Sequence, residues 1–144
     1  MDREQRRERV YALTSNPFTR EEIEEAQSAL RSYLADYPEE WVRDIGHSLP
    51  YDYDYLLERE AQSKEMGLSP EEHQERERLL RAAHAANDLD DLAPARNALR
   101  EWQCAYPGDP LVPRLLEMLE SEEKFERELK AALAETESLQ RIAA

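Results

Sequence analysis

Residues 29–40, ALRSYLADYPEE, and residues 98–110, ALREWQCAYPGDP, share a pattern that decides the fold. When the chain is shifted by 69 positions, residues 22–38 align with residues 91–107 without a gap, and six of the 17 pairs are identical. Ordinary residue frequencies would give roughly one identity by chance. We therefore interpret the two segments as copies of one helix that is followed by one turn.

Each copy has the same order of small and large apolar residues on one helical face. A small residue is followed by a large apolar one four positions later, by another after three more, and by a proline after a further five. The small residue lets a neighbouring helix approach closely, and the proline ends the helix because the residue before a proline is pushed out of the α region. The positions are Ala26, Leu30, Tyr33 and Pro38 in the first copy and Ala95, Leu99, Trp102 and Pro107 in the second, preceded by Ile23 and Leu92.

This order of positions resembles the second helix of a tetratricopeptide repeat and the turn after it. The spacing of 69 is close to twice the family's period of about 34 residues. The resemblance implies stacked antiparallel helical hairpins, as in a fragment of an α-solenoid, and binding of peptides or proteins. The chain departs from the family at Glu60 and Glu72, where a middle repeat would have its small residue and its proline, and at Glu120 in the last unit. A plain right-handed helical bundle with two similar helix ends is the other interpretation.

The composition predicts an all-α fold with a long C-terminal helix, because the chain has only 3 glycines and few β-branched residues. Capping boxes at Thr19 and Ser69 predict two helix starts, and Gly67 predicts a helix end. We expect a break at Pro50, and we expect Pro94 in the first turn of its helix. The expected helices cover about 2–14, 20–36, 39–47, 53–66, 70–86 and 91–105, and a last helix starts after Pro110 and runs almost to the end.

A chain of 144 residues is expected to form one domain. Within a single helical domain over residues 1–144, residues 1–49 would form a first helical unit. Residues 50–69 would form an irregular connection and a helix, and residues 70–144 a second helical unit that includes the long C-terminal helix.

The chain is strongly acidic, with 33 Asp and Glu against 19 Lys and Arg and a net charge of −14. Such a charge repels nucleic-acid phosphates and anionic lipid headgroups, so we expect no direct binding of nucleic acid or membranes. A basic surface of another protein is the expected partner, although the acidity also serves solubility. The single Cys104 and the charged N-terminus without a secretory signal indicate a cytoplasmic protein.

No catalytic, cofactor-binding or metal-binding residue is expected, and we interpret the chain as a protein without enzymatic activity. His73 and His84 are too far apart along one helix to share a metal, and His47 stands alone. The sequence has no paired cysteines, phosphate-binding loop or nucleophile elbow. Cys104 is expected to be a small buried residue near Trp102.

The segment PYDYDY at 50–55 is the most unusual in the chain. Its rings and carboxylates form a candidate surface for a basic peptide. In the other interpretation, the tyrosines seal the joint between two helices and the aspartates cap the second of them. The candidate partner-binding residues are Tyr51, Asp52, Tyr53, Asp54 and Tyr55.

The last helix has apolar residues near a 4-3 spacing, which is typical of a coiled-coil seam. Leu115, Met118, Phe125 and Leu129 form this candidate seam, interrupted by Glu122, and a homodimer through it is a further expectation. The function expected overall is a protein–protein interaction module, either an adaptor or a subunit of a larger assembly. The alternative is an acidic helical mimic of nucleic acid that inhibits a DNA-binding protein.

Overall fold

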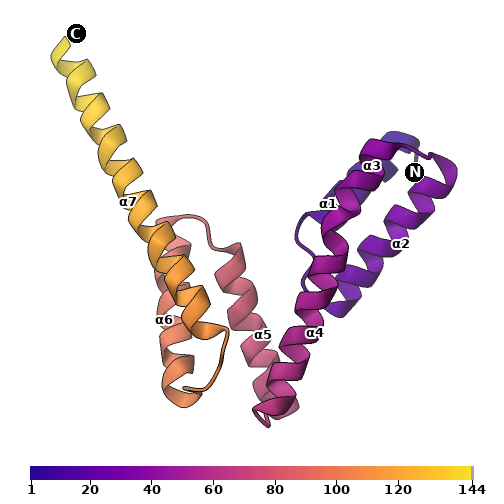
Figure 1. Cartoon of the computed structure of the whole chain (residues 1–144). Coiled ribbons are helices and arrows are strands. Elements are labelled where there is room, and N and C mark those ends of the chain that lie inside the picture. Colours follow the sequence, from indigo (N-terminus) through magenta and orange to yellow (C-terminus); the bar gives the residue numbers. More distant parts are fainter. Residues whose placement is uncertain (144) are drawn as a thin grey trace. The chain divides into compact units, whose positions relative to one another are not determined.

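The computed structural model describes residues 1–143, which form helices and no strands. It confirms the expected all-α fold, the packing of neighbouring helices and the long C-terminal helix. The helices in chain order are α1 (Arg3–Ser15), α2 (Arg20–Asp36), α3 (Glu40–Ile45), the short 3-10 helix η1 (Gly46–Ser48), α4 (Leu49–Glu65), α5 (Pro70–Ala85), α6 (Leu89–Ala105) and α7 (Val112–Ala143) (Figure 1).

The predicted helix boundaries at Thr19, Gly67 and Ser69 are confirmed. The hydroxyls of Thr19 and Ser69 each accept a hydrogen bond from the backbone N–H three residues later, and the glutamate at that position accepts one from the cap's own N–H. Gly67 has a φ of 71°, and the Leu68 N–H donates to the Ser63 carbonyl at 3.1 Å. This pattern ends α4, and it requires a residue that tolerates positive φ.

The expectations about the two prolines were wrong. No break occurs at Pro50, because α4 begins at Leu49 and places Pro50 in its first turn, where a missing N–H leaves no helical bond unmade. The segment from 50 is therefore helical throughout. Pro94 lies in the second turn of α6, because Asp88 caps this helix through the Asp91 N–H and the helix begins at Leu89.

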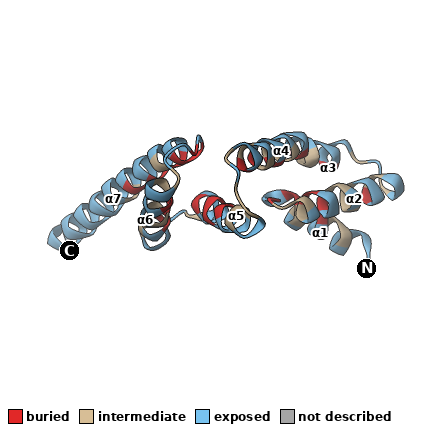
Figure 2. Ribbon diagram, turned by 90° about the horizontal axis from the view of Figure 1, so that it is seen from below, coloured by how far each residue is buried: buried red, intermediate tan, exposed pale blue. Residues whose placement is uncertain are grey.

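The chain divides into two compact units, residues 1–61 and residues 62–144. In the first unit, α1, α2 and α3 contact one another, and in the second unit α5, α6 and α7 do the same. Buried apolar residues form each core, as Figure 2 shows. They include Val10, Ile23, Ala26, Tyr33 and Val42 in the first unit and Leu80, Ala83, Leu92, Leu99, Trp102, Leu111, Val112 and Leu119 in the second.

The two copies of the repeated segment occupy the middle helix of their three-helix sets, α2 and α6. Ala26, Tyr33, Ala95 and Trp102 are all buried there. In both copies the large aromatic residue contacts the ring four residues later, with 5.2 Å between the Tyr33 and Tyr37 centroids and 4.1 Å in the second copy. These residues therefore pack alike in the two units, whereas Leu30 is half-buried and its equivalent Leu99 is fully buried.

Candidate interaction surface

The Tyr-Asp segment lies on the first turns of α4, so Tyr51 and Tyr55 share one side of the helix and Tyr53 lies on the other. Tyr51 is exposed, whereas Tyr53 and Tyr55 are half-buried. The Arg20 guanidinium lies 5.8 Å from the Tyr53 ring centroid, and the Phe18 ring meets the Tyr55 ring edge-on at 6.4 Å. Within the first unit, two of the three tyrosines thus already contribute to packing. A role of Tyr51–Tyr55 in partner binding stays a prediction.

The two aspartates of this segment differ in their surroundings. Asp54 is exposed, whereas Asp52 is half-buried in the first turn of α4, inside the helix rather than at its cap. Burial raises the pKa of the Asp52 carboxyl, and the charge of Arg59 partly opposes this. Burial therefore disfavours the charged form of Asp52, and within the described residues its Oδ2 accepts no hydrogen bond.

Arg59 is a buried cation that the sequence patterns did not reveal. Its guanidinium lies 3.7 Å from the Phe18 ring centroid and 4.6 Å from that of Tyr55, and it donates a hydrogen bond to the Phe18 carbonyl at 2.8 Å. Stacking on aromatic faces is a favourable place for a desolvated guanidinium. This arrangement joins α4 to the loop before α2.

A second buried cluster lies in the second unit around Arg76 and Asp109, whose side chains are 1% and 0% exposed. Arg76 donates to both carboxylate oxygens of Asp109, at 2.7 and 2.9 Å, and also to Ser63 and Gln62. The Trp102 indole N–H donates to the same carboxylate at 2.9 Å. The cluster fixes the turn between α6 and α7 on α5, so we assign it a structural role.

The first half of α7 packs within its own unit, and the second half does not. Val112, Leu115 and Leu119 are buried, and buried Glu123 forms ion pairs with Arg96 and Arg127. Figure 1 shows α7 continuing past α6, and Figure 2 shows this part of the helix in the colour of exposed residues. Leu115 of the candidate seam is therefore covered by the chain itself, whereas Met118, Phe125 and Leu129 are exposed.

Exposed apolar residues spaced by 3, 4 or 7 form one face of α7, which we call the α7 strip. Phe125, the largest of them, is 59% exposed, and Leu133, which the 4-3 seam omitted, is 57% exposed. Its position four residues after Leu129 is the sequence signal that could have identified it. The α7 strip consists of Met118, Phe125, Leu129, Ala132, Leu133 and Leu139.

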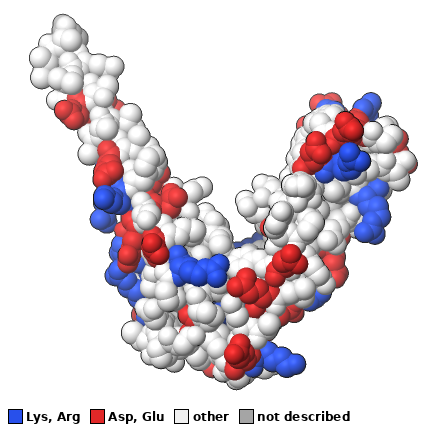
Figure 3. Space-filling view, in the orientation of Figure 1, with Lys and Arg blue, Asp and Glu red and all other residues white. Residues whose placement is uncertain are grey.

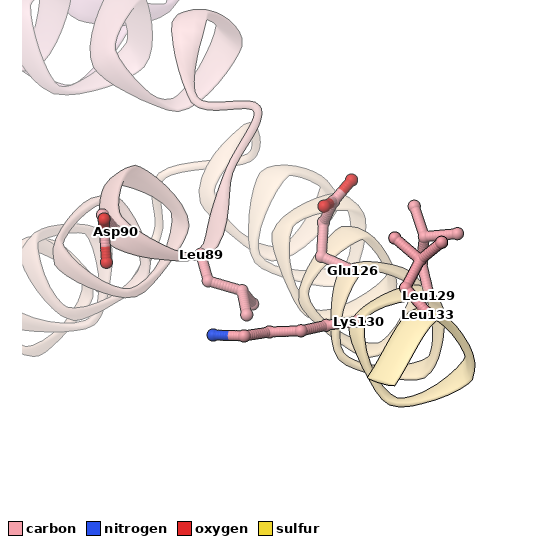
Figure 4. A pocket seen from close by; sticks show the side chains of 6 residues that line it. All are labelled: Leu89, Asp90, Glu126, Leu129, Lys130 and Leu133. Carbon is pink, nitrogen blue, oxygen red and sulfur yellow. The ribbon is translucent and has the colours of Figure 1, made fainter. Parts of the chain in front are cut away.

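A shallow groove of about 280 Å³ adjoins the α7 strip at the start of α6. Figure 4 shows Lys130 extended toward Leu89, with Leu129 and Leu133 side by side on another side of α7. The groove is lined by Leu89, Asp90, Glu126, Leu129, Lys130 and Leu133. The lining combines apolar side chains with two carboxylates and one ammonium group.

The remaining candidate groups have ordinary surroundings. The His73 Nδ1 lies 2.8 Å from the Ser63 hydroxyl, and no group of three potential metal ligands occurs within residues 1–143. The expectation that Cys104 is buried was wrong, because its side chain points outward from α6. No helix in the part of the chain described is both long and apolar enough to cross a bilayer.

Comparison with known proteins gives no match, either to a protein-family model or to a curated protein or solved structure. What the chain does must therefore be inferred from its own residues.

Proposed function

We propose that this chain is a protein–protein interaction module without enzymatic activity, acting as an adaptor or as a subunit of a larger assembly. The observation that carries this proposal is the α7 strip. Large apolar side chains at Phe125, Leu129 and Leu133 stand exposed on a helix that continues beyond the helices packed against its beginning. Contiguous apolar surface of this kind is typical of an interaction site.

The stability of α7 also favours a partner that binds the α7 strip. Most helical stability in proteins comes from packing of an apolar face rather than from intrinsic propensity. The second half of α7 has an apolar face without packing inside its unit. A partner that covers the α7 strip would supply the missing contacts, at about 25 cal/mol for each Å² of apolar surface buried.

The charge of the chain favours a basic partner. A net charge of −14 steers cationic surfaces toward the protein and is screened by salt. The similarity of the two repeated segments to tetratricopeptide repeats, which bind peptides or proteins, adds support. We also propose a cytoplasmic location, in keeping with a single exposed cysteine.

Mimicry of nucleic acid has less support as an alternative. It would need an array of carboxylates at phosphate-like spacing on one outer face. On the face in view in Figure 3, Lys and Arg side chains lie among the Asp and Glu side chains. Such mixing weakens the negative field that a DNA-binding protein would recognise.

Affinity purification from the source organism tests the proposal with matched variants of the full chain. Phe125→Ser with Leu129→Ser removes apolar surface from the α7 strip without changing the net charge. The control, Tyr51→Ser with Leu57→Ser, removes exposed apolar surface from α4. We expect one protein to co-purify with the wild type and with the control but not with the α7 variant. If this protein were lost only from the control, the site would instead lie on the Tyr-Asp segment. If both variants retained it, an apolar contact at either place would be refuted.

A further inference from the structure

We infer that the α7 strip binds an amphipathic helix of the partner whose apolar stripe is flanked by Lys and Arg. This inference rests on the proposed function and specifies the chemistry of the partner at that site. It follows from where the charged residues of α7 lie relative to its exposed apolar face.

Glutamates flank the α7 strip on both sides. Glu126 lies three residues before Leu129, on the side toward the packed face of α7. Glu122 lies seven residues before Leu129 and therefore falls on the strip itself. Glu128 and Glu135 lie on the other side, and Glu128 is three residues after Phe125. A helix docked on the strip would therefore meet carboxylates along both of its edges.

Two cations of α7 lie away from the strip, whereas Arg114 is one turn before Met118 and Lys124 is one turn before Glu128. Arg127 pairs with Glu123 at 3.4 Å, on the packed side of the helix. Lys130 extends toward Leu89 of α6 in Figure 4, away from Leu129 and Leu133. The edges of the strip therefore present net negative charge, which complements Lys and Arg on a partner helix.

A second copy of this chain is a poorer occupant for the same reason. In the 4-3 register, Glu122 is itself a seam residue between Leu115 and Leu129, so a parallel pair would place Glu122 against its own counterpart. An antiparallel pair would bring together the edges that carry Glu128 and Glu135. Like charges facing each other at such short range are destabilising. A Lys or Arg of a different helix opposite Glu122 would form an ion pair instead.

The groove beside the strip adds a place for one anchoring side chain. Leu129 and Leu133 belong both to the strip and to the lining of this groove, whose other walls include Leu89 of α6. Asp90 and Glu126 lie in the same lining together with Lys130, so the charged part of the lining has two carboxylates and one ammonium group. A large apolar residue of the partner helix, with a cation one turn away, would satisfy both kinds of lining.

Two synthetic helical peptides of about 20 residues with one leucine stripe test the inference. One has Lys and Arg on both sides of the stripe, and the other has Glu at the same positions. Fluorescence anisotropy with the full chain at about 0.05 M salt should show the basic peptide binding at least about tenfold tighter. The difference should shrink as salt is added. Equal binding of the two peptides, or no binding of the basic one, would overturn the inference.

Matched variants separate this site from the general acidity of the chain. Glu122→Gln with Glu128→Gln removes one charge from the strip and one from its edge, and Glu8→Gln with Glu24→Gln removes two exposed charges from the first unit. We expect the first pair to weaken binding of the basic peptide several-fold and the second pair to leave it almost unchanged. Equal effects would mean that only net charge acts, and the inference would fail.

Sedimentation of the chain alone distinguishes the remaining outcomes. A dimer that Phe125→Ser with Leu129→Ser dissociates would show that a second copy occupies the strip. If the native partner is lost with this variant while the basic peptide fails to bind, the proposed function stands and the basic helix is wrong. If the native partner is retained by the variant, the strip is not the interaction surface.

Discussion

Replacement of Asp109 by Asn should destabilise the second unit more than any other change of similar size. Asp109 is fully buried and accepts hydrogen bonds from Arg76, from the Trp102 indole and from the Leu111 N–H. An amide keeps the shape but leaves the guanidinium of Arg76 without its counter-charge. Removing one partner of a buried ion pair costs about 3–5 kcal/mol. A unit of roughly 80 residues has about 4–12 kcal/mol of stability in total, so this loss is a large part of it.

Urea denaturation followed by tryptophan fluorescence measures the effect on the correct unit. The chain has two tryptophans, Trp41 in the first unit and Trp102 in the second. In a Trp41→Phe background the signal reports the second unit alone. We expect the urea concentration at the midpoint of unfolding to be much lower in Asp109→Asn. A loss of less than about 1 kcal/mol would refute the assignment of Asp109 and Arg76 as a buried pair.

The same pair predicts a pH dependence. Burial by itself raises the pKa of Asp109, but the hydrogen bonds from Arg76, Trp102 and the Leu111 N–H outweigh it and hold the pKa below its usual value. A lowered pKa stabilises the folded state at pH values above the unfolded pKa of about 3.9, and this contribution is lost as the pH falls through the folded value. The second unit should therefore lose stability below about pH 4, and Asp109→Asn should lack this part of the loss.

Three further changes have expected outcomes. Gly46→Ala would place a methyl group against the end of the half-buried Leu30 side chain and should destabilise the first unit by about 1 kcal/mol at most in thermal unfolding, whereas Gly108→Ala, in open space, should be almost neutral. Trp102→Ala should cost about 3–5 kcal/mol in the second unit, and a neutral result would contradict its burial. Removal of residues 125–144 should leave the circular dichroism midpoint of the second unit nearly unchanged while abolishing partner binding.

The repeated segments show what sequence patterns can predict. The apolar spacing in residues 22–38 and 91–107 identified two equivalent helices, their buried faces and their ends, because helix periodicity and proline act locally. The same patterns missed Arg59 and Arg76, since their burial depends on rings and carboxylates 33 to 41 residues away in sequence. Charged residues of this kind look like solvated helix positions until the tertiary contacts are known.

The start of α4 illustrates a different limit. A proline at position 50 ends one helix or begins another with equal local preference, because its missing N–H is harmless in a first turn. Burial of Leu49 and Leu56 on one face favours the second outcome. The alternation of Tyr and Asp from 51 to 55 then becomes a helical arrangement in which Tyr53 lies on the other side of the helix from Tyr51 and Tyr55.

The long last helix has two apolar faces. The 4-3 spacing in the sequence assigned residues of both faces to a single seam. Leu115 and Leu119 are buried, and the buried position four residues later is Glu123, which its ion pairs neutralise. Phe125 and Leu129 begin a second face that is turned away from the first by about a quarter of the helix circumference, at 100° per residue. The first face holds α7 on α6, and the second carries glutamates along both edges. If the second face binds a partner as we propose, stability and recognition depend on different residues of one helix, and substitutions on the exposed face should change binding without unfolding the second unit.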